Sequence, residues 1–335
     1  MGATGSDRPL AASSAAVHGA EQGGEPAATV ARPSLAEHAP HRRPYGRAVL
    51  RALRPHHWLK NLLVFAPAVF GHMLSDIPTL VASSLAFVTF CLAASAIYLF
   101  NDMLDVESDR RHPIKRYRPL AAGELTFRDA TLICGLLLLS SAILSIALLP
   151  PLYSLVLACY AVANVAYSSW LKRKVMVDIV LLAGLYTLRI IAGGAATGIV
   201  PSEWLSALSL FLFLSLAFLK RFVELSRLRD EGIVRTDNRG YQMVDLELLQ
   251  VMGPACGLLA VLVLALYINS QQVLGLYEHP RVLWLVCPLL LYWIGRTWIW
   301  ARRGAITEDP LSFALRDRTS WIVLACVVAL GFLAI

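Results

Sequence analysis

Apolar side chains run through this chain in long continuous blocks, separated by short polar segments. Each block is close to the ~20 residues that an α-helix needs to cross a bilayer. Continuous rather than alternating blocks favour helices, which satisfy their own backbone hydrogen bonds inside a membrane. The pattern predicts an all-α polytopic membrane protein with nine spanning helices. We place them at residues 57–75, 79–100, 127–149, 152–171, 175–197, 204–221, 247–268, 282–301 and 319–335.

Proline and glycine mark breaks in this pattern. Pro67 interrupts the first span and predicts a kink there. Pro150-Pro151 and residues 198–201 predict tight turns between spans. Residues 1–40 are rich in Ala, Gly, Ser and Pro and lack the apolar core of a secretory signal. We expect a disordered tail there, followed by a membrane domain at residues 41–335.

The basic residues lie in every second loop. Of 30 Lys and Arg residues, 26 fall in the five segments 41–60, 101–128, 172–174, 220–239 and 296–318. The intervening loops contain only Arg281. Because basic loops stay in the cytoplasm, we expect a cytoplasmic amino terminus, an external carboxyl terminus and a multi-pass protein of the plasma membrane.

Composition excludes an ordinary soluble domain. The chain is 57% hydrophobic and 16% charged, with a mean hydropathy of +0.60, against about 25% charged residues in soluble domains. All six cysteines fall inside apolar blocks without metal-ligand spacing. They are expected to act as small hydrophobic side chains rather than as disulfides or ligands.

A charged motif, N-D-M-L-D-V-E-S-D, follows the second span. If the helix continues past Phe100, Asn101, Asp105 and Asp109 share one face, while Asp102 lies about 100° away. Carboxylates at this spacing repel each other, so a cation is expected between them. Oxygen ligands of this kind suit Mg²⁺ bridging to a diphosphate. The alternative is a solvated helix end neutralised by nearby basic side chains.

A basic segment, R-R-H-P-I-K-R-Y-R-P, comes next. Its two prolines disfavour helix in the residues before them, so we expect a loop in which His112 has no metal-binding partner. Lys115, Arg116 and Arg118 are the candidates for binding phosphate oxygens. An acidic row beside a basic loop predicts a polyanionic substrate that arrives from the cytosol.

Two further cytoplasmic patches carry candidate residues. Tyr167 and Lys172 follow the fourth span, and Lys220, Arg221 and Glu224 follow the sixth. Lys220 and Glu224 are four residues apart, so an ordinary ion pair along one helix is the alternative reading.

Arg189 lies inside the span 175–197. A charge at that depth is costly and marks a functional site by default. Asp178 is too distant along the same helix, so the partner should come from another helix or from a bound phosphate. Snorkelling or contact with backbone carbonyls is the alternative. Gly193-Gly194 favour a close helix approach or a bend, and Asp309-Pro310 indicates a later helix start.

The acidic motif resembles the first Asp-rich motif, N-x-x-x-D-x-x-x-D, of the UbiA superfamily of membrane prenyltransferases. The resemblance covers about residues 50–335 and implies a nine-helix bundle with a polar cavity at its cytoplasmic face. The chain departs from the superfamily in the sixth span, where K-R-F-V-E replaces a second acidic row. That difference weakens the case for a prenyl diphosphate donor held between two acidic rows.

Four motifs are similar to one branch, the decaprenyl-phosphate phosphoribosyltransferases. They are R-P-H-H-W-L-K-N (with Lys60 and Asn61), the extended acidic motif, L-K-R-x-x-E-L and D-P-x-x-F-A-x-x-D. This resemblance implies transfer of 5-phosphoribose from phosphoribosyl pyrophosphate to a polyprenyl phosphate, on the way to lipid-linked arabinose for cell-wall polysaccharide. Asn101, Asp105 and Asp109 would hold Mg²⁺ on the diphosphate. We expect the membrane as a further partner and no nucleic acid; a homo-oligomer is left open.

Lys115, Arg116 and Arg118 would bind donor phosphates, while Lys220, Arg221 and Arg189 would serve the 5-phosphate or the lipid phosphate. Two other functions remain. One is a prenyltransferase that joins a prenyl diphosphate to an aromatic acceptor, which predicts a second acidic row. The other is a transporter, which predicts charges near the membrane midplane.

Overall fold

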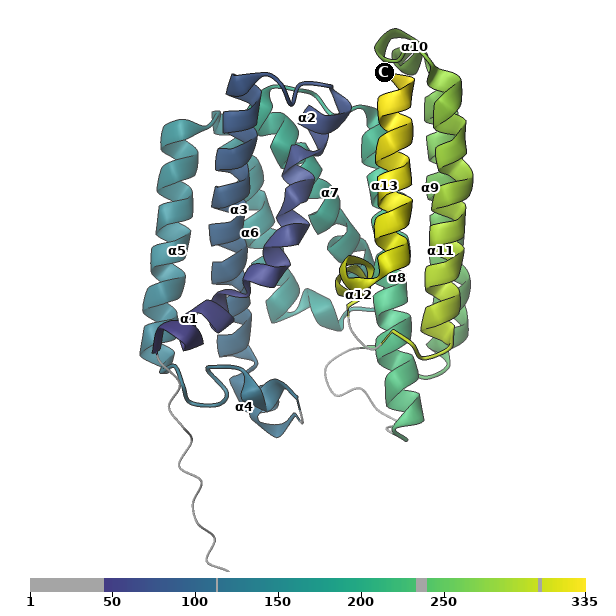
Figure 1. Ribbon diagram of the computed structural model, residues 1–335. Helices are drawn as coiled ribbons and strands as arrows, with labels where there is room; N and C mark the ends of the chain where they lie inside the picture. The colour runs from purple at the N-terminus through teal and green to yellow at the C-terminus, as the bar shows by residue number, and fades with distance from the viewer. Residues whose placement is uncertain (1–44, 113, 233–239, 307–308) are drawn as a thin grey trace, which may run out of the picture. The chain divides into compact units, whose positions relative to one another are not determined.

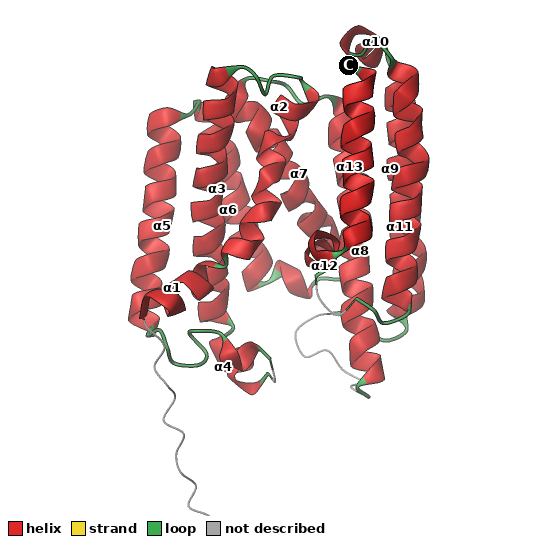
Figure 2. Cartoon of the chain, in the orientation of Figure 1, coloured by secondary structure: helices red, strands yellow, loops and turns green. Residues whose placement is uncertain are grey.

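The computed structural model describes residues 45–112, 114–232, 240–306 and 309–335. The described residues form helices and loops without a β-strand (Figure 2). The tail expected over residues 1–40 lies outside them. The α-helices are α1 (Tyr45–Leu53), α2 (Ala66–Phe70), α3 (Ile77–Leu104), α4 (Val106–Arg111), α5 (Phe127–Leu148), α6 (Pro151–Ser169), α7 (Val177–Thr197), α8 (Glu203–Asp230), α9 (Asp245–Ile268), α10 (Gln271–Leu276), α11 (Val286–Arg302), α12 (Pro310–Arg316) and α13 (Arg318–Ala334). The 3₁₀ segments are η1 (Pro55–Phe65), η2 (Lys115–Tyr117), η3 (Leu171–Arg173) and η4 (Pro280–Leu285).

Long helices make up the bundle (Figure 1). Within the described residues, seven helical segments are long and apolar enough to cross a membrane, and α13 is a shorter apolar helix. This confirms a multi-pass helical membrane protein. The count of nine spans and the direction of the termini stay predictions.

The first predicted span is not a regular α-helix. Residues 55–65 form the 3₁₀ segment η1, and α2 starts beside Pro67, which occupies its first turn. Proline fits that position because the first helical N–H groups have no partner within the helix. A 3₁₀ segment rises about 2.0 Å per residue, so η1 and α2 together have a contour of about 30 Å, enough for a hydrocarbon core.

Local signals set the other helix ends. The Asp76 carboxylate accepts from the Thr79 N–H at 3.0 Å at the start of α3, and Thr126 and Asp129 form a capping box on α5. The turn expected at residues 198–201 begins at Gly198, which ends α7 with φ 76°. These caps mark the starts of α3 and α5 and the end of α7.

The two largest clusters of buried apolar side chains among the described residues support the bundle. In one, Phe218 of α8 packs with Leu249 of α9 and Trp298 of α11. In the other, Phe90 of α3 packs with Tyr153 of α6 and Leu185 of α7. Helix α7 contacts both α6 and α8 and so connects the two clusters. The predicted close approach is confirmed: a Cβ at Gly193 would lie 1.9 Å from the Val64 carbonyl oxygen.

Candidate functional site

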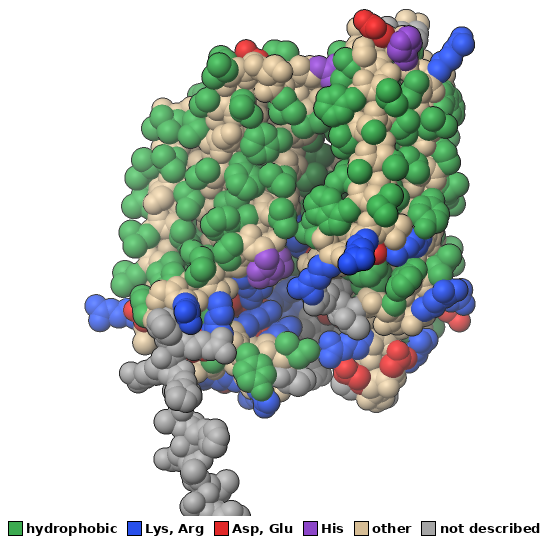
Figure 3. Space-filling model, in the orientation of Figure 1, with side chains coloured by type: hydrophobic (Ala, Val, Ile, Leu, Met, Phe, Trp, Pro, Cys, Tyr) green, Lys and Arg blue, Asp and Glu red, His purple; other side chains and the backbone are tan. Residues whose placement is uncertain are grey.

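A polar cavity of about 340 Å³ lies where the ends of α3, α6, α7 and α8 meet η1. Figure 3 shows Lys and Arg side chains gathered around a hollow at that end of the molecule. Among the described residues, seven basic and three acidic side chains line the cavity, which leaves four positive charges in excess. Such a cavity suits a polyanion. The side chains are Arg54, Lys60, Lys115, Arg118, Lys172, Arg189 and Lys220, with Asp102, Asp105 and Asp309.

The acidic motif reaches this cavity from the end of α3. Helix α3 continues to Leu104, and Asp105 separates it from α4. The i to i+4 backbone bonds nevertheless continue, from the Asp105 N–H to the Asn101 carbonyl at 3.0 Å and from the Asp109 N–H to the Asp105 carbonyl at 2.8 Å. Asn101 and Asp105 therefore line the cavity together, one turn apart.

Asp109 has a different environment from the other two residues of the row. Its side chain is 3% exposed and accepts a 2.6 Å hydrogen bond from Arg118 Nη1. The same Nη1 atom donates to Asp102 Oδ1 at 3.2 Å, and Arg54 Nη2 donates to that oxygen at 2.6 Å. Arg118 is thus fixed between two carboxylates at the cavity wall.

Asp102 and Arg54 were not predicted as site residues. Asp102 lies off the face of the predicted row but is 3% exposed and lines the cavity, because basic residues from two other segments surround the end of α3. Arg54 has a left-handed backbone, with φ 52° and ψ 59°. A non-glycine residue in that region costs roughly 1–3 kcal/mol. Its contact with Asp102 helps to offset that strain.

The residues around Asn101 fit a magnesium ion. The Asn101 Oδ1 atom is buried without a hydrogen-bond partner, and beside it Asp105 is bound by Lys172 Nζ at 3.0 and 3.2 Å. Mg²⁺ prefers one or two protein oxygens plus waters and phosphate oxygens. The described residues contain no group of three His, Cys, Asp or Glu side chains that would enclose a metal by itself. The donor set therefore suits Mg²⁺ that shares its coordination with a diphosphate.

The basic segment is partly helical rather than a plain loop. Arg110 and Arg111 belong to α4, and residues 115–117 form η2. Burial and the nearby Lys115 lower the pKa of His112, whose ring Nδ1 accepts from the N–H groups of Ile114 and Lys115 at 3.2 Å. Lys115 lines the cavity.

Arg116 lies outside this cavity wall. It is exposed and contacts Tyr117, whose hydroxyl accepts from its Nη2 at 2.8 Å. Of the three phosphate candidates in the basic segment, the structure therefore brings Lys115 and Arg118 to the cavity and leaves Arg116 on the outer surface.

Lys60 and Lys220 meet on a carboxylate that the sequence did not mark as a site residue. Asp309, directly before α12, accepts from Lys60 Nζ at 2.9 Å and binds Lys220 Nζ at 3.0 Å. Burial alone raises the pKa of Asp309, but Lys220 and Lys60 outweigh it and hold that pKa well below the usual range of a carboxyl group. The alternative ion pair between Lys220 and Glu224 is wrong, since Glu224 binds Arg221 instead.

Arg189 obtains two of its hydrogen-bond partners from other segments, as expected, and a third from a backbone carbonyl of α7, which was the alternative. Its Nε donates to Asn61 Oδ1 at 2.9 Å and its Nη2 to the Tyr160 hydroxyl at 2.8 Å. Its Nη1 also donates to the Leu185 carbonyl at 2.6 Å. The guanidinium lies over the rings of Tyr160 and Tyr186, and its side chain lines the cavity.

Arg221 is engaged in the bundle rather than at the cavity. It is 2% exposed and binds the carboxylates of Asp178 and Glu224, while its Nη2 donates to the Tyr167 hydroxyl at 3.0 Å. Tyr167 itself lines the cavity together with Lys172. Asp178, which lies too far along α7 to reach Arg189, forms its ion pair with Arg221 instead.

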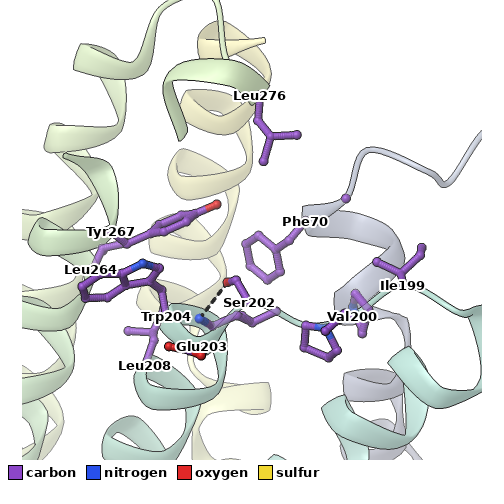
Figure 4. Close-up of a pocket in the computed structure, with 14 residues that line it drawn as sticks. Phe70, Ile199, Val200, Ser202, Glu203, Trp204, Leu208, Leu264, Tyr267 and Leu276 are labelled. Atoms are coloured by element: carbon purple, nitrogen blue, oxygen red, sulfur yellow. Dashed lines mark hydrogen bonds between the residues drawn. The ribbon is translucent and has the colours of Figure 1, made fainter. Parts of the chain in front are cut away.

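A larger cavity of about 640 Å³ lies at the opposite end of the helices. Figure 4 shows its wall, in which Phe70, Trp204 and Tyr267 surround an apolar space. Glu203 is the charged residue among the described residues that line it. With so little charge, this cavity is unsuited to phosphate chemistry, and the smaller polar cavity is the candidate site.

Comparison with known proteins agrees with this placement. The model of the UbiA prenyltransferase family matches residues 64–316, which include the acidic motif and most of the cavity wall. The chain belongs to the UbiA prenyltransferase family. It is therefore a membrane transferase, as the acidic motif predicted.

Three relatives illustrate the range of this UbiA group. The chain is 35% identical to the uncharacterized protein y4nM of Sinorhizobium fredii over 84% of its own length, but spans only 54% of that protein. It is 35% identical to the nodulation protein NoeC of Azorhizobium caulinodans, with 84% and 90% of the two chains covered. It is 33% identical to the decaprenyl-phosphate phosphoribosyltransferase of Mycolicibacterium smegmatis, with 84% and 91% covered.

The fold is also that of a solved UbiA protein. The UbiA homologue from Archaeoglobus fulgidus bound to DMAPP and Mg²⁺ superposes with a TM-score of 0.64, covering 84% of this chain and 98% of that one. The two sequences are 17% identical, so the likeness shows a common architecture.

Proposed function

We propose that this UbiA transferase moves 5-phosphoribose from phosphoribosyl pyrophosphate to a polyprenyl phosphate and releases pyrophosphate. The observation that carries the proposal is the charge of the cavity, which the described residues line with seven basic and three acidic side chains and with one acidic row at α3. At the expected place of a second row, Lys220 enters the cavity. A donor diphosphate together with an acceptor phosphate uses this arrangement better than a prenyl diphosphate with an aromatic acceptor does. The identity to the mycobacterial enzyme, at 33%, supports the same reading.

Each part of the cavity has a role in this reaction. Asn101 and Asp105 would hold Mg²⁺, with Asp109 positioning Arg118 beside them. The metal would supply charge neutralisation at the diphosphate. Arg118, Lys115 and the nearby Lys172 would bind diphosphate oxygens through charge-assisted hydrogen bonds.

In the reaction, the bond from C1 of the ribose to the diphosphate oxygen breaks, and its electron pair leaves with pyrophosphate. An oxygen of the acceptor phosphate then forms the new bond to C1. The acceptor is already an anion, so the site needs no strong general base. Basic residues fixed before substrate arrives stabilise the developing negative charge on the leaving group.

A membrane setting follows from the lipid acceptor. We propose that the cavity end of the bundle faces the cytosol in a plasma membrane and that the product leads toward lipid-linked arabinose for cell-wall polysaccharide. The excess of basic side chains at this end supports that orientation. The number of chains in the active particle is left open.

A direct transfer assay tests the proposal. The purified protein in detergent is given radiolabelled phosphoribosyl pyrophosphate and decaprenyl phosphate, with Mg²⁺ or EDTA, and label is followed into the organic phase. We expect Mg²⁺-dependent transfer that Asp105→Ala abolishes and Glu107→Ala preserves, because Glu107 is an exposed residue of α4 paired with Arg110. Absence of transfer by a folded preparation, together with prenylation of an aromatic acid from a prenyl diphosphate, would favour the quinone-type alternative.

A further inference from the structure

Two lysines from distant parts of the chain converge on one carboxylate. Lys60 of η1 is bound to Asp309 Oδ2 at 2.9 Å and Lys220 of α8 to Asp309 Oδ1 at 3.0 Å. The Lys60 side chain is only 10% exposed and that of Asp309 17%. Two ammonium groups brought this close in a partly buried site repel each other unless an anion lies between them. In the structure, the anion is the carboxylate of the chain itself.

The charges do not balance in this arrangement. Among the described residues, one carboxylate against two ammonium groups leaves one positive charge, whereas a phosphate monoester dianion would neutralise both lysines. A phosphate also offers three oxygen acceptors where the carboxylate offers two. The lysine pair therefore matches a phosphate monoester better than it matches Asp309.

The surroundings indicate which phosphate monoester fits. Lys220 and Asp309 line the polar cavity and also a neighbouring recess whose walls are Leu182, Phe213 and Leu216. The lysine pair thus lies at the boundary between polar and apolar surfaces. A phosphate attached to a hydrocarbon chain has this same division, whereas a sugar phosphate is polar throughout.

The recess is nearly closed in this state. It holds about 10 Å³, and Asp309 and Pro310 form part of its wall. An apolar chain needs more room than this, and outward movement of Asp309 and Pro310 would widen the recess. Displacement of the Asp309 carboxylate from the two lysines would let Asp309 and Pro310 move, and this movement would open the recess.

We propose that the phosphate of a polyprenyl phosphate binds Lys60 and Lys220. The Asp309 carboxylate occupies this phosphate site until the lipid phosphate displaces it. The assignment rests on the proposed function, because it takes the lipid phosphate to be a substrate of this cavity. It divides the basic residues between the substrates: the lysine pair binds the acceptor, while Arg118, Lys115 and Lys172 bind the donor diphosphate.

Binding measurements test this without the transfer reaction. Farnesyl phosphate is titrated into the full-length protein in detergent, with ribose 5-phosphate as a phosphate without a lipid and farnesol as a lipid without a phosphate. Asp309→Asn should bind farnesyl phosphate more tightly, because competition by the carboxylate lowers the apparent affinity by the fraction of time that the site is free. An occupancy of about nine-tenths corresponds to a tightening of about tenfold. Glu203→Gln, at the other end of the bundle, removes one carboxylate as the matched control and should leave the affinity unchanged.

The Lys220→Met variant provides a second, independent result. It should weaken farnesyl phosphate binding about tenfold, as loss of one charge-assisted contact does, and leave farnesol binding unchanged. If Asp309→Asn does not fold, unchanged farnesyl phosphate binding by folded Lys220→Met would overturn the proposal.

The possible outcomes separate the explanations. Unchanged or weaker farnesyl phosphate binding by folded Asp309→Asn would overturn the proposal and make Asp309 a structural link between η1 and α8. Tighter binding of ribose 5-phosphate alone would assign the lysines to the donor and also overturn it. If Asp309→Asn tightens farnesyl phosphate binding while no ribosyl transfer is seen, the phosphate site stands and the proposed reaction fails.

Discussion

Gly193 of α7 packs against η1, the segment that carries part of the candidate site. Replacing Gly193 with alanine should therefore lower both stability and activity. A Cβ there would lie 1.9 Å from the carbonyl oxygen of Val64 and 3.1 Å from Pro67 Cδ, whereas ordinary contact begins near 3.4 Å. Because both helical backbones are closely packed, η1 would have to move away from α7 by about 1.5 Å.

That movement reaches the cavity. η1 carries Lys60 and Asn61, and Asn61 accepts from Arg189 one turn before Gly193. We expect Gly193→Ala to lower the free energy of unfolding by about 1–3 kcal/mol, as overpacking does. The kcat/KM for transfer should fall on the order of 100-fold, because a displacement of about 1 Å is enough to misplace reacting groups.

The same helix offers a matched control. A Cβ at Gly184 would meet nothing within 4 Å, so Gly184→Ala should leave transfer unchanged and raise stability by up to about 1 kcal/mol. Unfolding in mixed micelles, followed by tryptophan fluorescence, and initial transfer rates measure both effects. A Gly193→Ala protein as stable and active as the Gly184→Ala protein would refute the close contact between η1 and α7.

Three further results are expected. Arg189→Lys should fold but lose at least about tenfold in kcat/KM, since an ammonium cannot reproduce the directed bonds of the guanidinium; a rate within twofold of wild type would argue against a role in binding. Asp178→Asn should lower the free energy of unfolding by about 3–5 kcal/mol, because it removes one of the two carboxylates that bind the buried Arg221. The control Arg227→Gln breaks an exposed ion pair and should lower the free energy of unfolding by under about 1 kcal/mol in the same micelle assay. The folded-state pKa of Asp309 lies below the ~3.9 of an unfolded carboxyl group, so its ion pairs stabilise the fold above about pH 4 and are lost as pH falls through the folded-state pKa. The melting-temperature difference between wild type and Asp309→Asn should be constant from pH 8 to 5 and shrink below pH 4; a constant difference at all pH values would contradict this.

The membrane fold was predictable because its signal is local. A block of about 20 apolar residues must be helical in a bilayer wherever it lies in the chain, and the structure has seven such helical segments among its described residues. The exception is η1, where Pro55 and Pro67 bracket the segment and each fits the start of a helical stretch rather than its interior. The interruption was visible in the sequence, but the 3₁₀ geometry between the prolines was not.

Part of the site was predictable for the same reason. Asn101 and Asp105 share a face because one helical turn separates them, and the structure places both at the cavity. Asp102 was missed because its angular position on the helix does not reveal which other segments pack around the helix end. Arg54 and Arg118 reach it from 48 and 16 residues away in sequence. The pairing of Lys60 with Asp309 spans 249 residues and has no local signal, since it depends on how η1, α8 and the segment before α12 pack together.

The two buried arginines show what the structure adds most clearly. Arg189 and Arg221 both lie on long apolar helices and both are at most 5% exposed, so hydropathy treats them alike. Arg221 forms ion pairs with the carboxylates of Asp178 and Glu224, and these carboxylates neutralise its charge within the fold. The hydrogen bonds of Arg189 go to neutral acceptors on Asn61, Tyr160 and the α7 backbone. These acceptors orient a guanidinium without cancelling its charge, and its side chain borders the cavity. A buried cation costs several kcal/mol unless an anion offsets it, and a phosphate in the cavity would supply that anion. We infer that, of these two arginines, Arg189 is the one whose charge binds a substrate phosphate.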